Sequence, residues 1–241
     1  MKNITAALLF VIINLSAAVS LTGQYKSESE NFKKFQLIPV DDSSNDPEFR
    51  SFIEEFKKAV AVKNIKYIKK HISPQIIYSF ENENTDAEAF FKAWKLNRSY
   101  RKSEFWNEME RVLATVPSSS EEDGNRYYVF PYVFEKFPGD QYDSYSYAAV
   151  TAKKVNLRKT PSVKGKVLAS LDYEIVKIIE ATHEKRKVRV GGKSGSWIKV
   201  QTSSGTRGYI FDYYLHSPIG YRAIFKKNTG TWLLTHFITG D

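Results

Sequence analysis

The sequence predicts an α+β fold in which a small all-β barrel is inserted into a larger domain of helices and strands. The 241 residues are enough for two globular domains. Apolar residues recur at helical spacing before residue 117, whereas short β-prone runs separated by turn residues fill positions 155–215. A further hairpin follows these runs, and a two-stranded hairpin needs partners from elsewhere in the chain.

The first 20 residues have the pattern of a secretory signal peptide. Lys2 precedes an apolar run from Ile4 to Leu15, and small residues lead to Ser20. We therefore expect cleavage near Ser20 and export to the periplasm or the extracellular space. An uncleaved anchor is the alternative, although the run is shorter than the ~20 residues of a spanning helix. The mature chain is expected to have no membrane span.

Residues 21–45 are polar and predict a linker or a loosely attached arm. An α+β domain is then expected from residues 46–147 together with 217–241. Its first helix begins at Asp46 and Pro47, an N-cap and a first-turn proline. The apolar side chains of this helix recur every three or four residues and predict one buried face: Phe49, Phe52, Ile53, Phe56 and Val60.

Three more helices are expected in the same domain. The first covers 64–71, the second follows a capping box formed by Thr85 and Glu88, and the third starts at Ser103. A weak strand is predicted over 75–80, and a loop rich in serine and acidic residues over 117–125.

The strand that is expected over 127–134 decides how the two domains are connected. It contains Pro131, which favours a sheet edge or a bend. If it pairs with the terminal hairpin, predicted over 221–226 and 231–237, the barrel is an insertion; otherwise the domains follow in tandem. The order of helices and strands outside the barrel is similar to that of the cone-shaped nuclear transport factor two class.

The segment 148–216 predicts the small barrel. Its β-prone runs are separated by turns at 161–165, 191–196 and 203–208. It opens with VNLRKTPS and later carries a Trp197-x-x-Val200 strand and a Gly208-Tyr209-Ile210 turn. These motifs resemble the bacterial Src homology 3 (SH3) family. The resemblance implies a five-stranded barrel of a kind that often accompanies wall-cleaving enzymes.

The positive charge of the chain is concentrated in this segment. Between Ala149 and His216 there are 14 basic and 5 acidic residues, whereas the rest of the mature chain has 21 basic and 22 acidic residues. An exported protein rarely meets nucleic acid, so the predicted partner is an anionic cell-wall polymer, a peptide carboxylate or an envelope protein. A basic surface that only aids solubility is the alternative interpretation.

No catalytic group, metal site or cofactor is predicted, and we expect the protein not to be an enzyme. The chain has no cysteine, so disulfides, thiolate zinc sites and a cysteine nucleophile are excluded. The four histidines form no H-E-x-x-H array, and no G-x-S-x-G motif is present. The GGKS run at 191–194 has Lys187 in place of the first glycine of a phosphate-binding loop, so it predicts a turn.

The leading functional hypothesis is an exported binding protein whose barrel contacts a cell-wall or peptide ligand. Exposed aromatic rings and cations would form the contact surface, and the candidates for ligand binding are Arg158, Tyr173, Trp197, Tyr209 and Tyr213. Trp197 and Tyr209 equally suit the barrel core.

Two other hypotheses remain open. The α+β domain could hold a small ligand or catalyse a reaction in an aromatic pocket, with core packing as the other interpretation of the same rings: Phe90, Trp94, Phe105, Trp106 and Trp232. The barrel could also serve as a periplasmic protein-interaction or inhibitor module.

Overall fold

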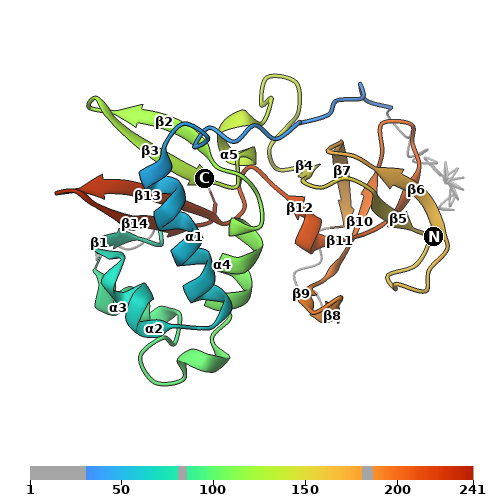
Figure 1. Cartoon of the computed structure of the whole chain (residues 1–241). Coiled ribbons are helices and arrows are strands. Elements are labelled where there is room, and N and C mark those ends of the chain that lie inside the picture. The colour runs from blue at the N-terminus through green and yellow to red at the C-terminus, as the bar shows by residue number, and fades with distance from the viewer. Residues whose placement is uncertain (1–30, 81–85, 181–186, 241) are drawn as a thin grey trace, which may run out of the picture. The chain divides into compact units, whose positions relative to one another are not determined.

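The computed structural model describes residues 31–80, 86–180 and 187–240, so the predicted signal peptide lies outside the described ranges. Within these ranges the chain is built from helices and many strands, and the predicted α+β class is confirmed (Figure 1). Two large sheets and one small two-stranded sheet contain all the paired strands described.

The first sheet has five strands in an order that brings distant parts of the chain together. Its strands in spatial order are β1 (Ile72–Ile77), β14 (Thr231–Ile238), β13 (Arg222–Asn228), β3 (Asn125–Phe130) and β2 (Ser118–Glu122). β1 and β14 are parallel, and the other pairs are antiparallel. β13 pairs with β3, so the segment that contains the second sheet interrupts the first sheet in the sequence, as the inserted arrangement requires.

Helices from the N-terminal half share a core with this sheet. They are α1 (Pro47–Ala61), α2 (Ile65–Lys70), α3 (Ala87–Ala93), the 3-10 turn η1 (Tyr100–Lys102) and α4 (Phe105–Leu113). A last short helix, α5 (Val133–Lys136), follows β3. We call these elements together with the first sheet the first domain.

The predicted start of α1 is confirmed, and the same residue ties the helix to the sheet. One carboxylate oxygen of Asp46 accepts the backbone N–H of Phe49 at 2.9 Å, and the other accepts the hydroxyl of Tyr128 in β3 at 3.0 Å. The rings of Phe49 and Tyr128 stack with centroids 3.9 Å apart. Burial and this hydrogen bond raise the pKa of Tyr128 to about 12, so its hydroxyl stays a donor at neutral pH.

The inserted domain, residues 147–216, is built on the second sheet. Its seven strands in spatial order are β12 (Leu215–His216), β4 (Tyr147–Val150), β7 (Ile175–Glu180), β10 (Trp197–Gln201), β11 (Arg207–Phe211), β5 (Val155–Arg158) and β6 (Val167–Leu171). The 3-10 turn η2 (Asp212–Tyr214) links β11 to β12, and β8 (Val188–Val190) pairs with β9 (Lys193–Gly195). A separate apolar core fills this domain, with Leu157, Val176, Val200 and Ile210 fully buried.

The stretch predicted as a polar linker is packed where the structure describes it. Residues 35–37 bond to the edge of the inserted domain: Leu37 N–H donates to Tyr173 O at 2.8 Å, and Ile175 N–H donates to Phe35 O at 3.0 Å. Leu37 is buried, and its carbonyl accepts the hydroxyl of Tyr132 at 2.7 Å. Alternating apolar side chains within a polar stretch account for this packed arm.

Other element boundaries also differ from the sequence prediction. The expected loop over 117–125 is the hairpin β2–β3, because Asp123 and Gly124 adopt positive φ at a two-residue turn. β3 lies inside the sheet and ends at Phe130, since Pro131 has no N–H for the ladder. β1 begins at Ile72, three residues before the predicted strand. Asp86, rather than Thr85, caps α3; Thr85 lies outside the described residues.

The aromatic residues that were considered as walls of a ligand pocket belong to the core of the first domain. Phe90, Phe105 and Trp106 are at most 2% exposed, and Trp232 is buried against Phe49 with ring centroids 4.8 Å apart. Trp94 is half-buried and packs on Phe237 at 5.1 Å. These contacts favour the core-packing interpretation of this set.

Replacing Phe225 by alanine is expected to destabilise the protein by about 3–5 kcal/mol, because the cavity cannot close around a fully buried ring. Phe225 meets four other rings, Phe49, Phe52, Phe56 and Phe130, at centroid distances of 5.1–6.1 Å. Urea unfolding measures the change. Val62→Ala is the control, because residue 62 is 72% exposed, and its unfolding free energy should stay within ~0.5 kcal/mol of the wild-type value. Equal losses of unfolding free energy in Phe225→Ala and Val62→Ala would contradict the place of Phe225 in the core.

One buried histidine, His216, and one half-buried histidine, His236, make stability depend on pH. His216 is 2% exposed and its Nε2 has no hydrogen-bond partner among the described residues. Burial, aided by Arg111, holds the pKa of His216 well below its ordinary value. Burial, aided by Lys226 and Arg222, lowers the pKa of His236 to about 4. Both imidazoles are therefore neutral in the folded protein at pH 7.

Stability should fall as the pH drops from 7 towards 5. Below pH 6.5 the unfolded chain takes up protons on both histidines while the folded chain does not, so protonation favours unfolding. The stability that the two neutral histidines contribute is fully present above pH 6.5. It is lost as the pH falls from there towards the pKa that each histidine has in the folded protein. His216→Leu and His236→Leu should each flatten the plot of unfolding free energy against pH. An unchanged slope in both variants would contradict this assignment.

Candidate functional site

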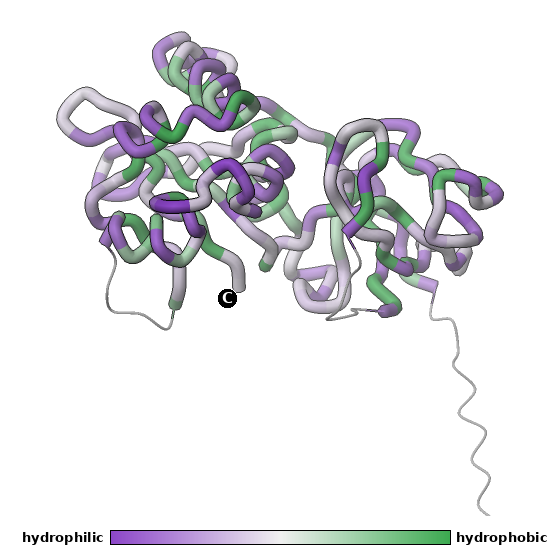
Figure 2. Tube along the Cα trace, turned by 90° about the horizontal axis from the view of Figure 1, so that it is seen from below, coloured by the Kyte–Doolittle hydropathy of each residue, from purple (hydrophilic) through white to green (hydrophobic). Residues whose placement is uncertain are grey.

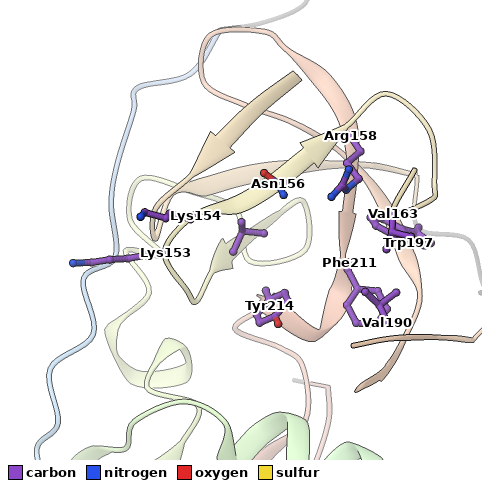
Figure 3. Close-up of a pocket in the computed structure, with 10 residues that line it drawn as sticks. Lys153, Lys154, Asn156, Arg158, Val163, Val190, Trp197, Phe211 and Tyr214 are labelled. Atoms are coloured by element: carbon purple, nitrogen blue, oxygen red, sulfur yellow. The ribbon is translucent and has the colours of Figure 1, made fainter. Parts of the chain in front are cut away.

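The inserted domain carries a pocket of about 300 Å³ beside β5, which we call the β5 pocket (Figure 3). β5 and the two residues before it contribute five lining residues: Lys153, Lys154, Val155, Asn156 and Arg158. The remaining walls come from later parts of the domain: Val163 of the loop before β6, Val190 of β8, Trp197 of β10, Phe211 of β11 and Tyr214 of η2.

Strand register places the main side chains on one face of the second sheet. Trp197 lies opposite Phe211, and Tyr209 lies opposite Arg158. Side chains of directly opposed residues point to the same face, and so do alternate residues along one strand. Tyr209 and Phe211 alternate in β11, so Arg158, Trp197, Tyr209 and Phe211 share this face. The apolar core lies on the other face, where Leu157, Ile198 and Ile210 are buried.

Close packing of β11 against β5 holds Arg158 in position. A Cβ on Gly208 would lie 2.7 Å from the carbonyl oxygen of Arg158 and 2.9 Å from Cγ of Leu157, so only glycine fits there. Arg158 is half-buried, and its Nη1 donates to Gly165 O at 2.9 Å, which ties the loop 159–166 to the strand. The guanidinium thus has a fixed place at the pocket.

The pocket is cationic at its rim and apolar within. Its lining includes three cations and no carboxylate. Figure 3 shows Lys153 and Lys154 at one end, with ammonium groups that extend outwards, while Val163, Val190, Trp197 and Phe211 cluster at the other. The loop that supplies Val163 carries three further exposed lysines: Lys159, Lys164 and Lys166. Such a surface suits an anionic ligand that also has apolar groups.

The structure brings together three of the five residues that were predicted to bind ligand. Arg158 and Trp197 line the β5 pocket, and Tyr209 lies on the same face next to Arg158. Tyr173 lies at the turn after β6, where its carbonyl accepts the N–H of Leu37. Tyr213 is 7% exposed and lies under Lys193, whose Nζ is 5.2 Å from the ring centroid. Its phenol is therefore mostly covered.

Several residues of the pocket were not predicted from the sequence: Lys153, Lys154, Val163, Val190, Phe211 and Tyr214. Phe211 could have been found, because it follows Tyr209 by two residues in the same strand and must share its face. The others reach the pocket from turns and from the β8–β9 hairpin, whose positions depend on tertiary packing.

Residues 153–216 match the family model of the bacterial SH3 domain, and this part of the chain is such a domain. The predicted resemblance is thus confirmed for about a quarter of the chain. A bacterial SH3 domain suggests a module that binds protein or the cell wall. No curated protein and no solved structure matches the chain, so the similarity of the first domain to the nuclear transport factor two class stays a prediction.

The described residues offer neither a cluster of metal ligands nor a helix that could span a membrane. Within the described ranges, no group of three or more histidine, aspartate or glutamate side chains is arranged to hold a metal ion. None of the helices described has the length and apolar character needed to cross a membrane.

Gly208→Ala should destabilise the inserted domain by about 1–3 kcal/mol, because the added methyl group meets the backbone of β5. Thermal unfolding measures the loss. Gly139→Ala is the matched control, since a Cβ there has no neighbour within 4 Å and the change should be close to neutral. A melting temperature for Gly208→Ala equal to that of the control would contradict the close approach of β11 and β5.

Proposed function

We propose that this protein is exported and binds a carboxylate-bearing cell-wall polymer or peptide at the β5 pocket, without catalysing a reaction. The observation that carries the proposal is the pocket itself, whose rim has three cations and no carboxylate around an aromatic floor. It lies in the bacterial SH3 domain. The N-terminal sequence supports export, with a basic residue, an apolar run and small residues before position 21.

Charge and chemistry both favour a wall ligand. Lysines at the rim attract anions at long range, and aromatic rings give flat apolar surface for the methyl and methylene groups of a peptide. Lys153, Lys154 and Arg158 form none of the ion pairs found among the described residues, so their charge is available to a ligand. Lys193 and Lys199, in contrast, pair with Glu110 and Glu180 at 2.6 Å.

Binding to purified peptidoglycan tests the proposal. The wild-type protein should sediment with it at 0.05 M salt and stay in solution at about 0.5 M salt, where exposed charges are screened. Lys153→Glu should weaken retention about fivefold, because an attractive charge becomes repulsive. Trp197→Ala should weaken it about tenfold through loss of the aromatic contact.

The control for charge is Lys66→Glu, an exposed lysine of α2 with the same change of net charge. It should bind as the wild type does. Absence of wild-type retention at low salt would overturn the proposal. Equal retention of Lys153→Glu and Lys66→Glu would show that net charge, rather than the β5 pocket, is responsible.

A further inference from the structure

One lysine of the β5 pocket has a backbone conformation that lysine rarely adopts. Lys154 has φ of 56°, in the left-handed region, and it directly precedes β5. Lys63 and Lys95 also have φ of 55°, but each stands one residue after the C-cap of a helix, where this conformation is common. Lys154 follows no helix, so helix termination does not explain its conformation.

Hydrogen bonds keep Lys154 in this conformation. Its N–H donates to Oδ1 of Asp172 at 2.5 Å, across from the end of β6. Tyr173, beside Asp172, is also left-handed with φ of 57°, and its N–H donates to Ala152 O at 3.3 Å. Glycine or asparagine would adopt the same turn with less strain. The local fold therefore gives no reason for a lysine at this position.

The side chain of Lys154 is exposed and makes no ion pair among the described residues. What a lysine supplies here, and glycine would not, is a cation at one end of the pocket. Strained residues that persist without a packing reason concentrate at functional sites. The observation of strain thus points to a role in ligand binding.

We propose that Lys154 is a specificity-determining residue, held in a left-handed conformation by Asp172, and that it binds the carboxylate of a peptide whose apolar side chain lies against Trp197 and Phe211. This inference rests on the proposed function of the β5 pocket. Lys153 lies at the same end and adds a second cation, while the flexible stems of both lysines allow their ammonium groups to close on the carboxylate.

The pocket distinguishes a peptide from a phosphate polymer. Valine, tryptophan and phenylalanine side chains form the end opposite the lysines. A polyol phosphate chain has no large apolar group to cover them, whereas a peptide offers a side chain and a carboxylate on one short segment. The volume of the β5 pocket, about 300 Å³, accommodates only a small part of a polymer, such as a peptide end.

Substitution of Lys154 gives effects of opposite sign on stability and on binding. Lys154→Gly and Lys154→Asn should raise the melting temperature by about 2 °C, since strain is relieved. Both should weaken binding of soluble disaccharide-peptide fragments of peptidoglycan about fivefold by calorimetry, because one cation is lost. Lys95→Gly is the matched control: it relieves the same conformation at a residue of the first domain that does not line the pocket, and it should leave affinity unchanged.

Chemical modification of the probe tests the carboxylate. Fragments whose carboxylates are converted to amides should bind the wild-type protein about fivefold more weakly and should no longer distinguish it from Lys154→Gly. A glycerol-phosphate polymer should bind at least fivefold more weakly than the unmodified fragments.

The outcomes separate this inference from the proposed function. If the wild type binds no fragment, the proposed function fails. If the wild type binds and Lys153→Glu binds more weakly, yet Lys154→Gly binds as tightly as wild type, the role of Lys154 is wrong and the pocket stands. A lower melting temperature for Lys154→Gly, or preference for the phosphate polymer, would also overturn the inference.

Discussion

Two antiparallel strand pairings determine how the two domains are connected, one in the first sheet and one between the first and last strands of the inserted domain. β3 and β13 are neighbours in the first sheet, with Phe130 opposite Ala223, although the whole inserted domain separates them in sequence. The inserted domain begins and ends with β4 and β12, which pair through Val150 with Leu215 and Ala149 with His216. The chain therefore leaves and returns by adjacent strands, and each domain keeps its own core.

This arrangement limits the entropic cost of the insertion. The entropic cost of closing a loop grows only slowly with its length. Because β4 and β12 pair at the two ends of the inserted domain, the folded domain already holds these two chain ends close together. The arm at residues 35–37 adds a further connection, since it bonds to Tyr173 and Ile175 before the chain enters α1. The side chains that line the β5 pocket can therefore change in sequence on one face of the second sheet, while the apolar side chains on the other face maintain the fold.

Local rules predicted the elements whose signals lie in a few adjacent residues. Asp46, Pro47 and the apolar spacing from Phe49 gave α1, and the hairpin around Asn228 gave β13 and β14. β2 was missed because its sequence SSSEE lacks apolar alternation, although Asp123 and Gly124 carry a strong hairpin signal. Of the pocket, Arg158 and Trp197 were found from a family motif. Lys154 was not, because its conformation depends on Asp172, 18 residues away.

The order of the strands along the chain also bears on the sequence in which the domains can form during synthesis. β13 and β14 lie next to each other inside the first sheet, and both follow the inserted domain in the chain. While a ribosome extends the chain, α1 to α4 emerge early with their aromatic faces uncovered, because Phe225, Leu234 and Phe237 are not yet made. The inserted domain has all its strands available first. The earlier part of the chain thus remains incomplete longer and stays open to chaperones.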